Sequence, residues 1–198
     1  MPKAVVFGAH GGIGQATTEQ FLRAGYVVVP VHSGLVDFTE PDSYKSVDTL
    51  LDTHKPDVVV NCAGHFDSTN QETHTKTFDV NVGSNWAIIQ HYINNRPKHP
   101  VKIVMVGSSA YRGGRKDYIL YSASKSALYN VWQGACDYFS DDSTVAIGLI
   151  NPVRTRTPMI DMTTTAFCYE PAEVAEIILK MASTDANQLV DMKYPEET

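Results

Sequence analysis

Short apolar runs alternate with longer amphipathic stretches along most of this chain. The short runs lack in/out alternation, as strands covered on both faces do, and we expect strands at Ala4–Phe7, Tyr26–Val31, Asp57–Asn61, Val101–Val106 and Val145–Ile150. The longer stretches have apolar residues at helical spacing and predict helices at Gly14–Ala24, Asp42–His54, Thr73–Asn94, Tyr121–Phe139 and Pro171–Met181. This order predicts an α/β fold with a doubly wound parallel sheet in three α/β/α layers.

The connection after the second expected strand is too short for a regular sheet of this kind. Only three residues separate Val31 from the next possible strand, Leu35–Phe38, whereas parallel neighbours need a crossover of a dozen or more. We therefore expect an abbreviated sheet at that edge. The length of 198 residues fits a single domain, 1–198.

A glycine cluster lies where the first strand meets the first helix. Side chains there would keep the backbone away from a pyrophosphate, and a helix N-terminus offers free N–H groups and a partial positive charge to an anion. This position predicts a Rossmann-type dinucleotide site, with candidate contacts from Gly8, His10, Gly12, Ile13 and Gly14. A tight turn without a ligand is the alternative, and His10 is as easily a solvent-facing residue as a phosphate contact.

A tyrosine and a lysine are four residues apart at the start of a predicted helix. Tyr121 and Lys125 therefore share one helical face, and a nearby ammonium would bring the phenol pKa from about 10 toward neutrality. Ser108 follows the strand Val101–Val106, at the edge where open α/β sheets bind ligands. The three side chains predict proton-transfer chemistry, although an exposed helix pair is the alternative for Tyr121 and Lys125.

Four sequence features together resemble the short-chain dehydrogenase/reductase family. They are the glycine spacing, Asn-Cys-Ala-Gly at 61–64, Ser-Ser at 108–109 and Tyr-Ser-Ala-Ser-Lys at 121–125. The resemblance extends from Val5 to Met159. It implies an NAD(P)-dependent oxidoreductase with the catalytic set Asn81, Ser108, Tyr121 and Lys125. The family serine usually lies thirteen positions before the tyrosine, which favours Ser108 and leaves Ser109 open.

The resemblance also implies a role for each catalytic residue. Tyr121 would exchange a proton with the substrate oxygen during hydride transfer, and Lys125 would lower its pKa and hold the ribose. Ser108 would bind the substrate carbonyl or alcohol, and Asn81 would hold a water for a proton relay.

Further cofactor contacts are implied on both sides of this set. Asn61, Ala63 and Gly64 match residues whose backbone approaches the adenine ribose, and Pro152 and Thr157 match a segment near the nicotinamide. Val153 replaces the usual glycine of that segment. The short loop at about 153–170 would shape the substrate pocket. Asn151-Pro152-Val153 and the following Thr-Pro-Met also resemble dihydropteridine reductases, which leaves such an enzyme as an alternative.

The end of the second strand bears on the choice between NAD and NADP. An acidic residue there would bind the ribose diol of NAD, but the sequence has His32 and Ser33, which can donate to a 2′-phosphate. We therefore expect NADP in preference to NAD. Asp37 resembles the family aspartate at the adenine amino group, with a turn or capping role as the alternative.

Composition limits the partners. With a net charge of −6 and scattered basic residues, we expect no nucleic acid partner, and no apolar stretch approaches the length of a membrane span. The histidines and cysteines show no metal-ligand spacing, and unpaired cysteines suggest the cytoplasm.

We expect a small carbonyl or alcohol substrate and a homodimer or homotetramer, formed through Thr73–Asn94 and Tyr121–Phe139 as the family implies. Longer members continue beyond Gln188-Leu189-Val190 into a last strand. A non-catalytic dinucleotide-binding or redox-sensing protein, or a cofactor-independent interaction protein, is the alternative.

Overall fold

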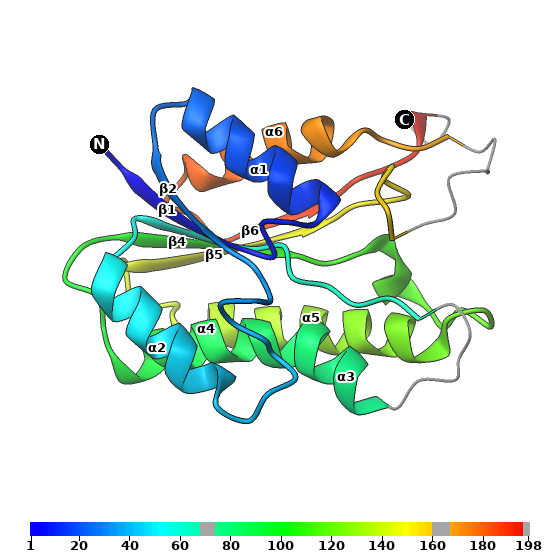
Figure 1. The fold of residues 1–198 in the computed structure, drawn as a ribbon, viewed down its shortest axis with the longest axis horizontal. Helices are drawn as coiled ribbons and strands as arrows, with labels where there is room; N and C mark the ends of the chain where they lie inside the picture. Colours follow the sequence, from blue (N-terminus) through cyan, green and yellow to red (C-terminus); the bar gives the residue numbers. More distant parts are fainter. Residues whose placement is uncertain (68–73, 160–166, 196–198) are drawn as a thin grey trace.

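Six parallel strands form one sheet in the computed structural model, which describes residues 1–67, 74–159 and 167–195 (Figure 1). The strand order is β2-β1-β3-β4-β5-β6. The strands are β1 Lys3–Phe7, β2 Val27–Val31, β3 Val58–Asn61, β4 Val101–Val106, β5 Val145–Asn151 and β6 Gln188–Asp191. The order reverses between β1 and β3, so the crevice at their carboxyl ends is where an open α/β sheet binds its ligand.

Helices cover both faces of the sheet, which gives the expected three layers (Figure 1). Helices α1 and α6 pack together on one face, and α2, α4 and α5 lie on the other. The helices are α1 Gly12–Arg23, α2 Ser43–His54, α3 His74–Phe78, α4 Ser84–Asn94, α5 Ile119–Tyr138 and α6 Pro171–Ala182, with a π-helical turn η1 at Asp79–Gly83 and a 3₁₀ turn η2 at Ser109–Arg112.

The sheet separates two apolar cores. Side chains on alternate positions of β1, β3 and β4 point to opposite faces, so Val5 packs toward α2, α4 and α5 whereas Val6 packs toward α1 and α6. The central strands β4 and β5 are buried over their whole length. This explains why they read as continuous apolar runs rather than as alternating ones.

Three features of the fold bear on the sequence predictions. The abbreviated edge is confirmed, because residues 32–38 form no strand and β2 is the edge strand. The single helix expected over Thr73–Asn94 is wrong within the described part, since α3, η1 and α4 replace it, and Thr73 itself lies outside the described residues. The sequence predicts no strand at Gln188–Val190, but that segment is part of β6.

Candidate functional site

The glycine loop places its backbone directly against the turn that follows β3. Gly8 has a φ of +70°, and a Cβ on it would lie 2.5 Å from the Ala63 nitrogen. A Cβ on Gly14 would collide with the Gly8 carbonyl oxygen. The structure therefore requires glycine at both positions, and the loop lies directly against Asn61–Gly64.

The first turn of α1 points toward the carboxyl edge of the sheet and has the properties of an anion site. Its N-cap, Gly11, has no side chain, and among the described residues no side chain caps the helix. A Cβ on Gly12 would meet Thr157 Cγ2 at 2.7 Å, so the segment after β5 lies against the helix start. Free N–H groups, a helix dipole and room for close approach together fit a dinucleotide pyrophosphate.

Asn61 and Asn81 are both fully buried and organise the floor of the site. The Asn61 amide oxygen accepts a hydrogen bond from the Ala63 nitrogen at 3.0 Å, which shapes the turn beside Gly8. Asn81 lies in the π-helical turn η1, and its amide joins the backbone of His65 at 2.7 and 2.9 Å. A third bond runs from Asn81 Nδ2 to Ser124 Oγ on α5, at 2.9 Å. π-helical turns are frequent at functional sites.

Ser108, Tyr121 and Lys125 converge at the carboxyl end of β4. The Ser108 side chain faces the Tyr121 hydroxyl and acts to lower its pKa. Lys125 is buried, donates from Nζ to the Val106 carbonyl at 3.1 Å, and lies 5.6 Å from the centroid of the Tyr121 ring. The Lys125 side chain also interacts electrostatically with Cys62, which lies beside the glycine loop. The structure therefore brings together the side chains that the sequence singled out.

The expected electrostatics differ in one respect. Burial raises the pKa of Tyr121, opposed by the hydrogen bond from Ser108, whereas the sequence predicted that Lys125 would lower it. Burial also lowers the pKa of Lys125 itself to about 8, so the ammonium is easily discharged. Desolvation disfavours the charged form of each group, and the Lys125 ammonium is engaged with Val106 rather than with the phenol.

Ser108 and Ser109 have different surroundings. Ser108 Oγ accepts from the Ala110 nitrogen at 3.2 Å and faces Tyr121, whereas the Ser109 nitrogen donates to the Pro152 carbonyl at 2.9 Å. Of the two serines, Ser108 is the one whose side chain acts on the Tyr121 hydroxyl. This geometry favours Ser108 over Ser109.

A hydrogen-bonded set behind Ser108 was missed by the sequence reasoning. Asn151 Oδ1 accepts from the Ser108 nitrogen at 3.1 Å, and Asn151 Nδ2 donates to Asp191 Oδ1 at 3.0 Å. Asp191 is the last residue of β6, a strand that the sequence did not predict. An asparagine at the end of an apolar strand, as Asn151 is, could have been recognised in the sequence as a candidate site residue. Its partner Asp191, forty positions later, could not have been found in this way.

The end of β2 forms an imidazole pair. His32 and His10 stack with their ring centroids 4.2 Å apart and their planes 11° apart, which joins the strand end to the glycine loop. His32 Nδ1 accepts from the Gly34 nitrogen at 3.1 Å, and Ser33 is exposed beside it. Asp37 forms a turn with Thr39, whose backbone nitrogen and hydroxyl donate to it at 3.0 and 2.7 Å. These hydrogen bonds lower the Asp37 pKa and correspond to the turn alternative.

Aromatic rings surround the phenol. Phe66 and Tyr118 pack edge-on against Tyr121, with ring centroids 4.9 and 5.9 Å away. Tyr111 lies elsewhere, stacked on Tyr129 at 4.7 Å. Tyr118 therefore lies beside Tyr121, whereas Tyr111 packs on Tyr129.

The loop after β5 is fastened at its base. Thr155 and Tyr169 form a parallel bridge, and Arg156 pairs with Glu170 at 2.8 Å. Pro152 and Val153 are buried, so the valine in place of the family glycine packs into the α6 core. The tip of the expected substrate loop, 160–166, lies outside the described residues.

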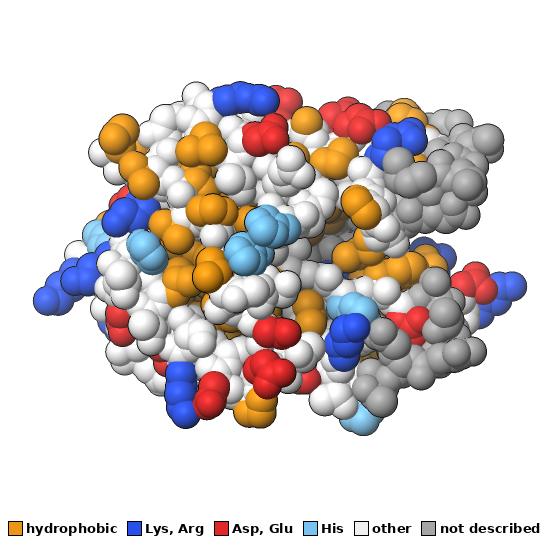
Figure 2. Space-filling view, in the orientation of Figure 1, with side chains coloured by type: hydrophobic (Ala, Val, Ile, Leu, Met, Phe, Trp, Pro, Cys, Tyr) orange, Lys and Arg blue, Asp and Glu red, His pale blue; other side chains and the backbone are white. Residues whose placement is uncertain are grey.

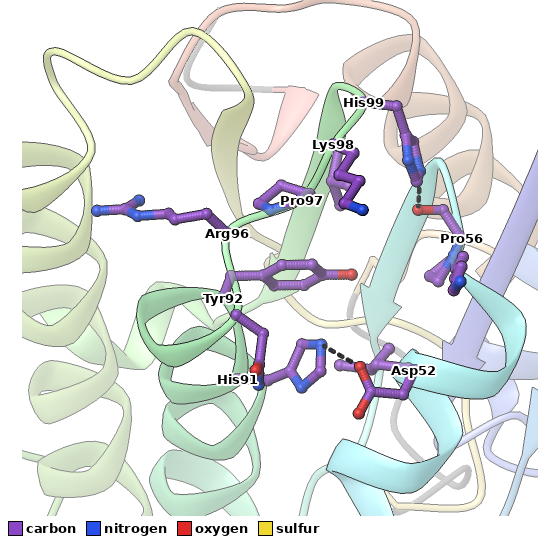
Figure 3. A pocket seen from close by; sticks show the side chains of 12 residues that line it. Asp52, Pro56, His91, Tyr92, Arg96, Pro97, Lys98 and His99 are labelled. Carbon is purple, nitrogen blue, oxygen red and sulfur yellow. Dashed lines mark hydrogen bonds and ion pairs between the residues drawn. The ribbon is translucent and has the colours of Figure 1, made fainter.

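The surface is hollowed between the two helical layers at the carboxyl edge of the sheet (Figure 2). A second hollow lies at the opposite edge, between the ends of α2 and α4, where Tyr92 points toward Pro56 and His91 pairs with Asp52 (Figure 3). No candidate site residue lines that second hollow. Burial raises the pKa of the Cys62 thiol to about 12. The described residues contain no metal-binding cluster and no helix suited to crossing a membrane.

Comparison with known families agrees with this geometry. The sequence model of the NAD dependent epimerase/dehydratase family matches residues 4–135, about two thirds of the chain, from β1 through most of α5. The chain belongs to this family, within the short-chain dehydrogenases/reductases. The resemblance inferred from the motifs is thereby confirmed.

Two curated relatives and one solved structure illustrate the similarity of this short-chain dehydrogenase/reductase. It is 29% identical over 159 residues to the bifunctional ribulose 5-phosphate reductase/CDP-ribitol pyrophosphorylase of Haemophilus influenzae, covering 73% of this chain and 32% of the relative. It is 31% identical over 142 residues to the 2,3-dihydro-2,3-dihydroxybenzoate dehydrogenase of Escherichia coli (strain K12), covering 62% and 57%. A short chain dehydrogenase from Burkholderia cenocepacia J2315 in complex with NADP has a TM-score of 0.83 at 19% identity, covering 99% of this chain and 90% of that one.

The matched part is only a portion of the curated relatives. The chain spans about a third of the first and just over half of the second.

Proposed function

We propose that this chain is an NAD(P)-dependent oxidoreductase that interconverts a small carbonyl compound and its alcohol, with Tyr121 as the acid/base. The observation that supports this most is that the Ser108 side chain faces the Tyr121 hydroxyl, one helical turn from the buried Lys125 and across the crevice from the glycine loop. A dinucleotide would lie between Gly8–Gly14 and Asn61–Gly64, with Pro152 and Thr157 on its nicotinamide side. The cofactor supplies or accepts the hydride when bound.

The protein supplies the proton. In the reducing direction the Tyr121 hydroxyl gives its proton to the carbonyl oxygen while hydride adds to the carbonyl carbon, and in the oxidising direction both transfers reverse. The raised pKa keeps the phenol protonated at neutral pH, which suits reduction. The Ser108 hydroxyl holds the substrate oxygen beside Tyr121. Lys125 offers a positive charge to the cofactor ribose and to the phenolate that forms.

Asn81 is proposed to position rather than to react. The side-chain amide of Asn81 is hydrogen-bonded to the His65 backbone and to Ser124. The backbone carbonyl of Asn81 accepts a hydrogen bond from Asn85 Nδ2 at 3.0 Å. The amide thus fixes the π-helical turn next to α5. A water held near this turn would link Lys125 to solvent, as the family resemblance implies.

The preference for NADP rests on His32 and His10. Solved structures that share this fold hold NADP or NADH, so the fold does not discriminate between them. The strand end that would bear an acidic residue for the NAD ribose instead presents two stacked imidazoles and Ser33. Imidazole N–H groups can donate to a phosphate, and a carboxylate would repel it. A homodimer and a cytoplasmic location stay predictions from the sequence.

A two-stage experiment tests the proposal. The purified chain is titrated with NADPH and NADH by cofactor fluorescence, and then D-ribulose 5-phosphate, 2,3-dihydro-2,3-dihydroxybenzoate with NADP⁺ or NAD⁺, and a panel of small ketones and aldehydes are assayed by nicotinamide absorbance. We expect tighter binding of NADPH and turnover of at least one compound class. Binding without any turnover would favour the redox-sensing alternative, and no binding would reject the assignment.

A further inference from the structure

Asn151 connects three strand ends behind the proposed active site. It is the last residue of β5 and only 1% exposed. Its amide oxygen binds the Ser108 nitrogen at 3.1 Å, at the end of β4, and its amide nitrogen donates to Asp191 Oδ1 at 3.0 Å, at the end of β6. The place of a Cβ on Gly107 is taken by Asn151 Oδ1, so the asparagine lies directly against the backbone that leads into Ser108.

Asp191 holds the same segment from a second direction. Its Oδ2 accepts from the Tyr111 hydroxyl at 2.9 Å and pairs with Arg112 Nη2 at 3.1 Å. Tyr111 and Arg112 belong to η2, which begins at the residue after Ser108. One carboxylate therefore binds both the start of this segment, through Asn151, and its end.

The charge state of the carboxylate fits this role. Burial acts to raise the pKa of Asp191, but hydrogen bonds from Asn151, Tyr111 and Arg112 hold it below its usual value. The group is thus ionised at neutral pH and accepts from all three donors. Charge-assisted hydrogen bonds of this kind are stronger than neutral ones.

The sheet itself does not need this arrangement. β6 is already joined to β5 by parallel pairing over Gly148–Asn151, and the Met192 nitrogen donates to the Asn151 carbonyl at 3.2 Å. The side-chain bonds instead converge on the backbone of 107–112. Within this segment, the group that faces Tyr121 is the Ser108 hydroxyl.

We propose that Asp191, acting through Asn151 and η2, is a positioning residue that sets the location of the Ser108 hydroxyl against Tyr121. The inference rests on the proposed function. Misplacement of a reacting or orienting group by about 1 Å can cost up to about 100-fold in rate. Asp191→Asn keeps the shape of the side chain but removes its charge, so Arg112 loses its ion pair and one donor is left facing an amide.

A double-mutant cycle tests this inference. Asp191→Asn, Ser108→Ala and the double variant are compared with the wild type for kcat, KM and NADPH affinity. We expect Asp191→Asn to lower kcat about tenfold with NADPH affinity within twofold, and to have no further effect in the Ser108→Ala background, because interacting residues are not additive. An equal loss of kcat in both backgrounds, or an unchanged kcat in a folded Asp191→Asn protein, would overturn the inference.

A matched control separates positioning from general stability. Asp142 likewise pairs with an arginine, Arg96 at 2.7 Å, but lies away from the proposed site. Asp142→Asn is expected to lower the unfolding midpoint and leave kcat unchanged. If Asp191→Asn does not fold, Tyr111→Phe removes one bond to the same carboxylate and enters the same cycle, with the same two overturning results.

The two proposals fail in different ways. If Tyr121→Phe keeps the wild-type kcat, the proposed function itself is wrong. If Tyr121→Phe loses turnover while Asp191→Asn retains it, only the positioning role of Asp191 is wrong.

Discussion

The Nζ of Lys125 lies 5.6 Å from the centroid of the Tyr121 ring and donates to the Val106 carbonyl, one helical turn from the phenol on α5. The lysine is buried at the crevice that the glycine loop borders, and its pKa is lowered to about 8 by that burial. Its charge is therefore available to an anionic cofactor only below about pH 8. We therefore expect cofactor binding to depend on pH.

NADPH affinity is expected to fall as the pH rises through 8. Below that pH the Lys125 ammonium is charged and favours the cofactor, and above it the neutral amine does not. A hydrogen bond to a charged group contributes roughly 1.5–3 kcal/mol, so the dissociation constant should rise about tenfold between pH 7 and pH 9.5. Fluorescence titrations measure it. The Lys125→Met protein should bind NADPH more weakly, with a dissociation constant that does not change with pH. A parallel rise of the dissociation constant with pH in both proteins would contradict the role of Lys125.

Gly8→Ala is expected to destabilise the protein more than Gly25→Ala. Both glycines have positive φ, +70° and +85°, so each alanine incurs a left-handed backbone cost of about 1–2 kcal/mol. A Cβ at Gly25 meets open space, whereas one at Gly8 would lie 2.5 Å from Ala63. Urea unfolding should show the difference, and Gly8→Ala should also lose NADPH binding. Equal destabilisation by the two substitutions would mean that the loop can shift to accommodate a Cβ at position 8, which would contradict the prediction.

His32→Asp is expected to shift cofactor preference toward NADH. A carboxylate at the end of β2 would repel a 2′-phosphate, bind a ribose diol and replace the ring that stacks on His10. The ratio of NADH to NADPH dissociation constants should fall more than tenfold. His99→Asp, at the opposite edge of the sheet, serves as the control and should leave the ratio unchanged. An unchanged ratio in His32→Asp would remove His32 from the cofactor site.

Lys102 is expected to make stability rise with pH above 8. It is buried in β4, and burial lowers its pKa to about 8, whereas an unfolded lysine keeps its proton to about pH 10.4. Between these values the unfolded state binds more protons, so the free energy of unfolding increases with pH. Relative to Lys102→Met, the wild type should gain about 1–2 kcal/mol from pH 7.5 to pH 10 in urea unfolding.

Lys180→Met is the control for that prediction. Lys180 is exposed and pairs with Glu176 on the surface of α6, so its removal should leave the pH dependence as in the wild type. If wild type and Lys102→Met show parallel curves, the buried lysine does not titrate in this range.

Much of the fold could be predicted because the strands differ strongly from the helices. Runs such as Val101–Val106 are apolar throughout, and the amphipathic stretches between them are long. β6 was missed because Gln188–Asp191 is a short, partly exposed edge strand with polar residues at both ends. The π-helical turn around Asn81 was missed because one extra residue per turn hardly alters the apolar spacing.

The site was predictable to the extent that its residues are close in sequence. Tyr121 and Lys125 are four residues apart and share a helical face whether or not the helix is buried. Gly8, Gly12 and Gly14 all lie at the one connection between the first strand and the first helix. The direction of the Tyr121 pKa depends on burial, and the bond between Asn151 and Asp191 depends on how β5 and β6 pair. Neither is visible in a single sequence, because both arise only when the sheet is assembled.

The most direct test of the proposed chemistry compares Tyr121→Phe with Tyr118→Phe. The two phenols are neighbours with their rings 5.9 Å apart, and the Ser108 side chain faces the Tyr121 hydroxyl. Turnover of a carbonyl substrate that the wild type reduces is measured with saturating NADPH, together with NADPH affinity. We predict a loss of about 10²–10⁴-fold in kcat for Tyr121→Phe with affinity within twofold, and a near wild-type kcat for Tyr118→Phe. Wild-type turnover in Tyr121→Phe would contradict it.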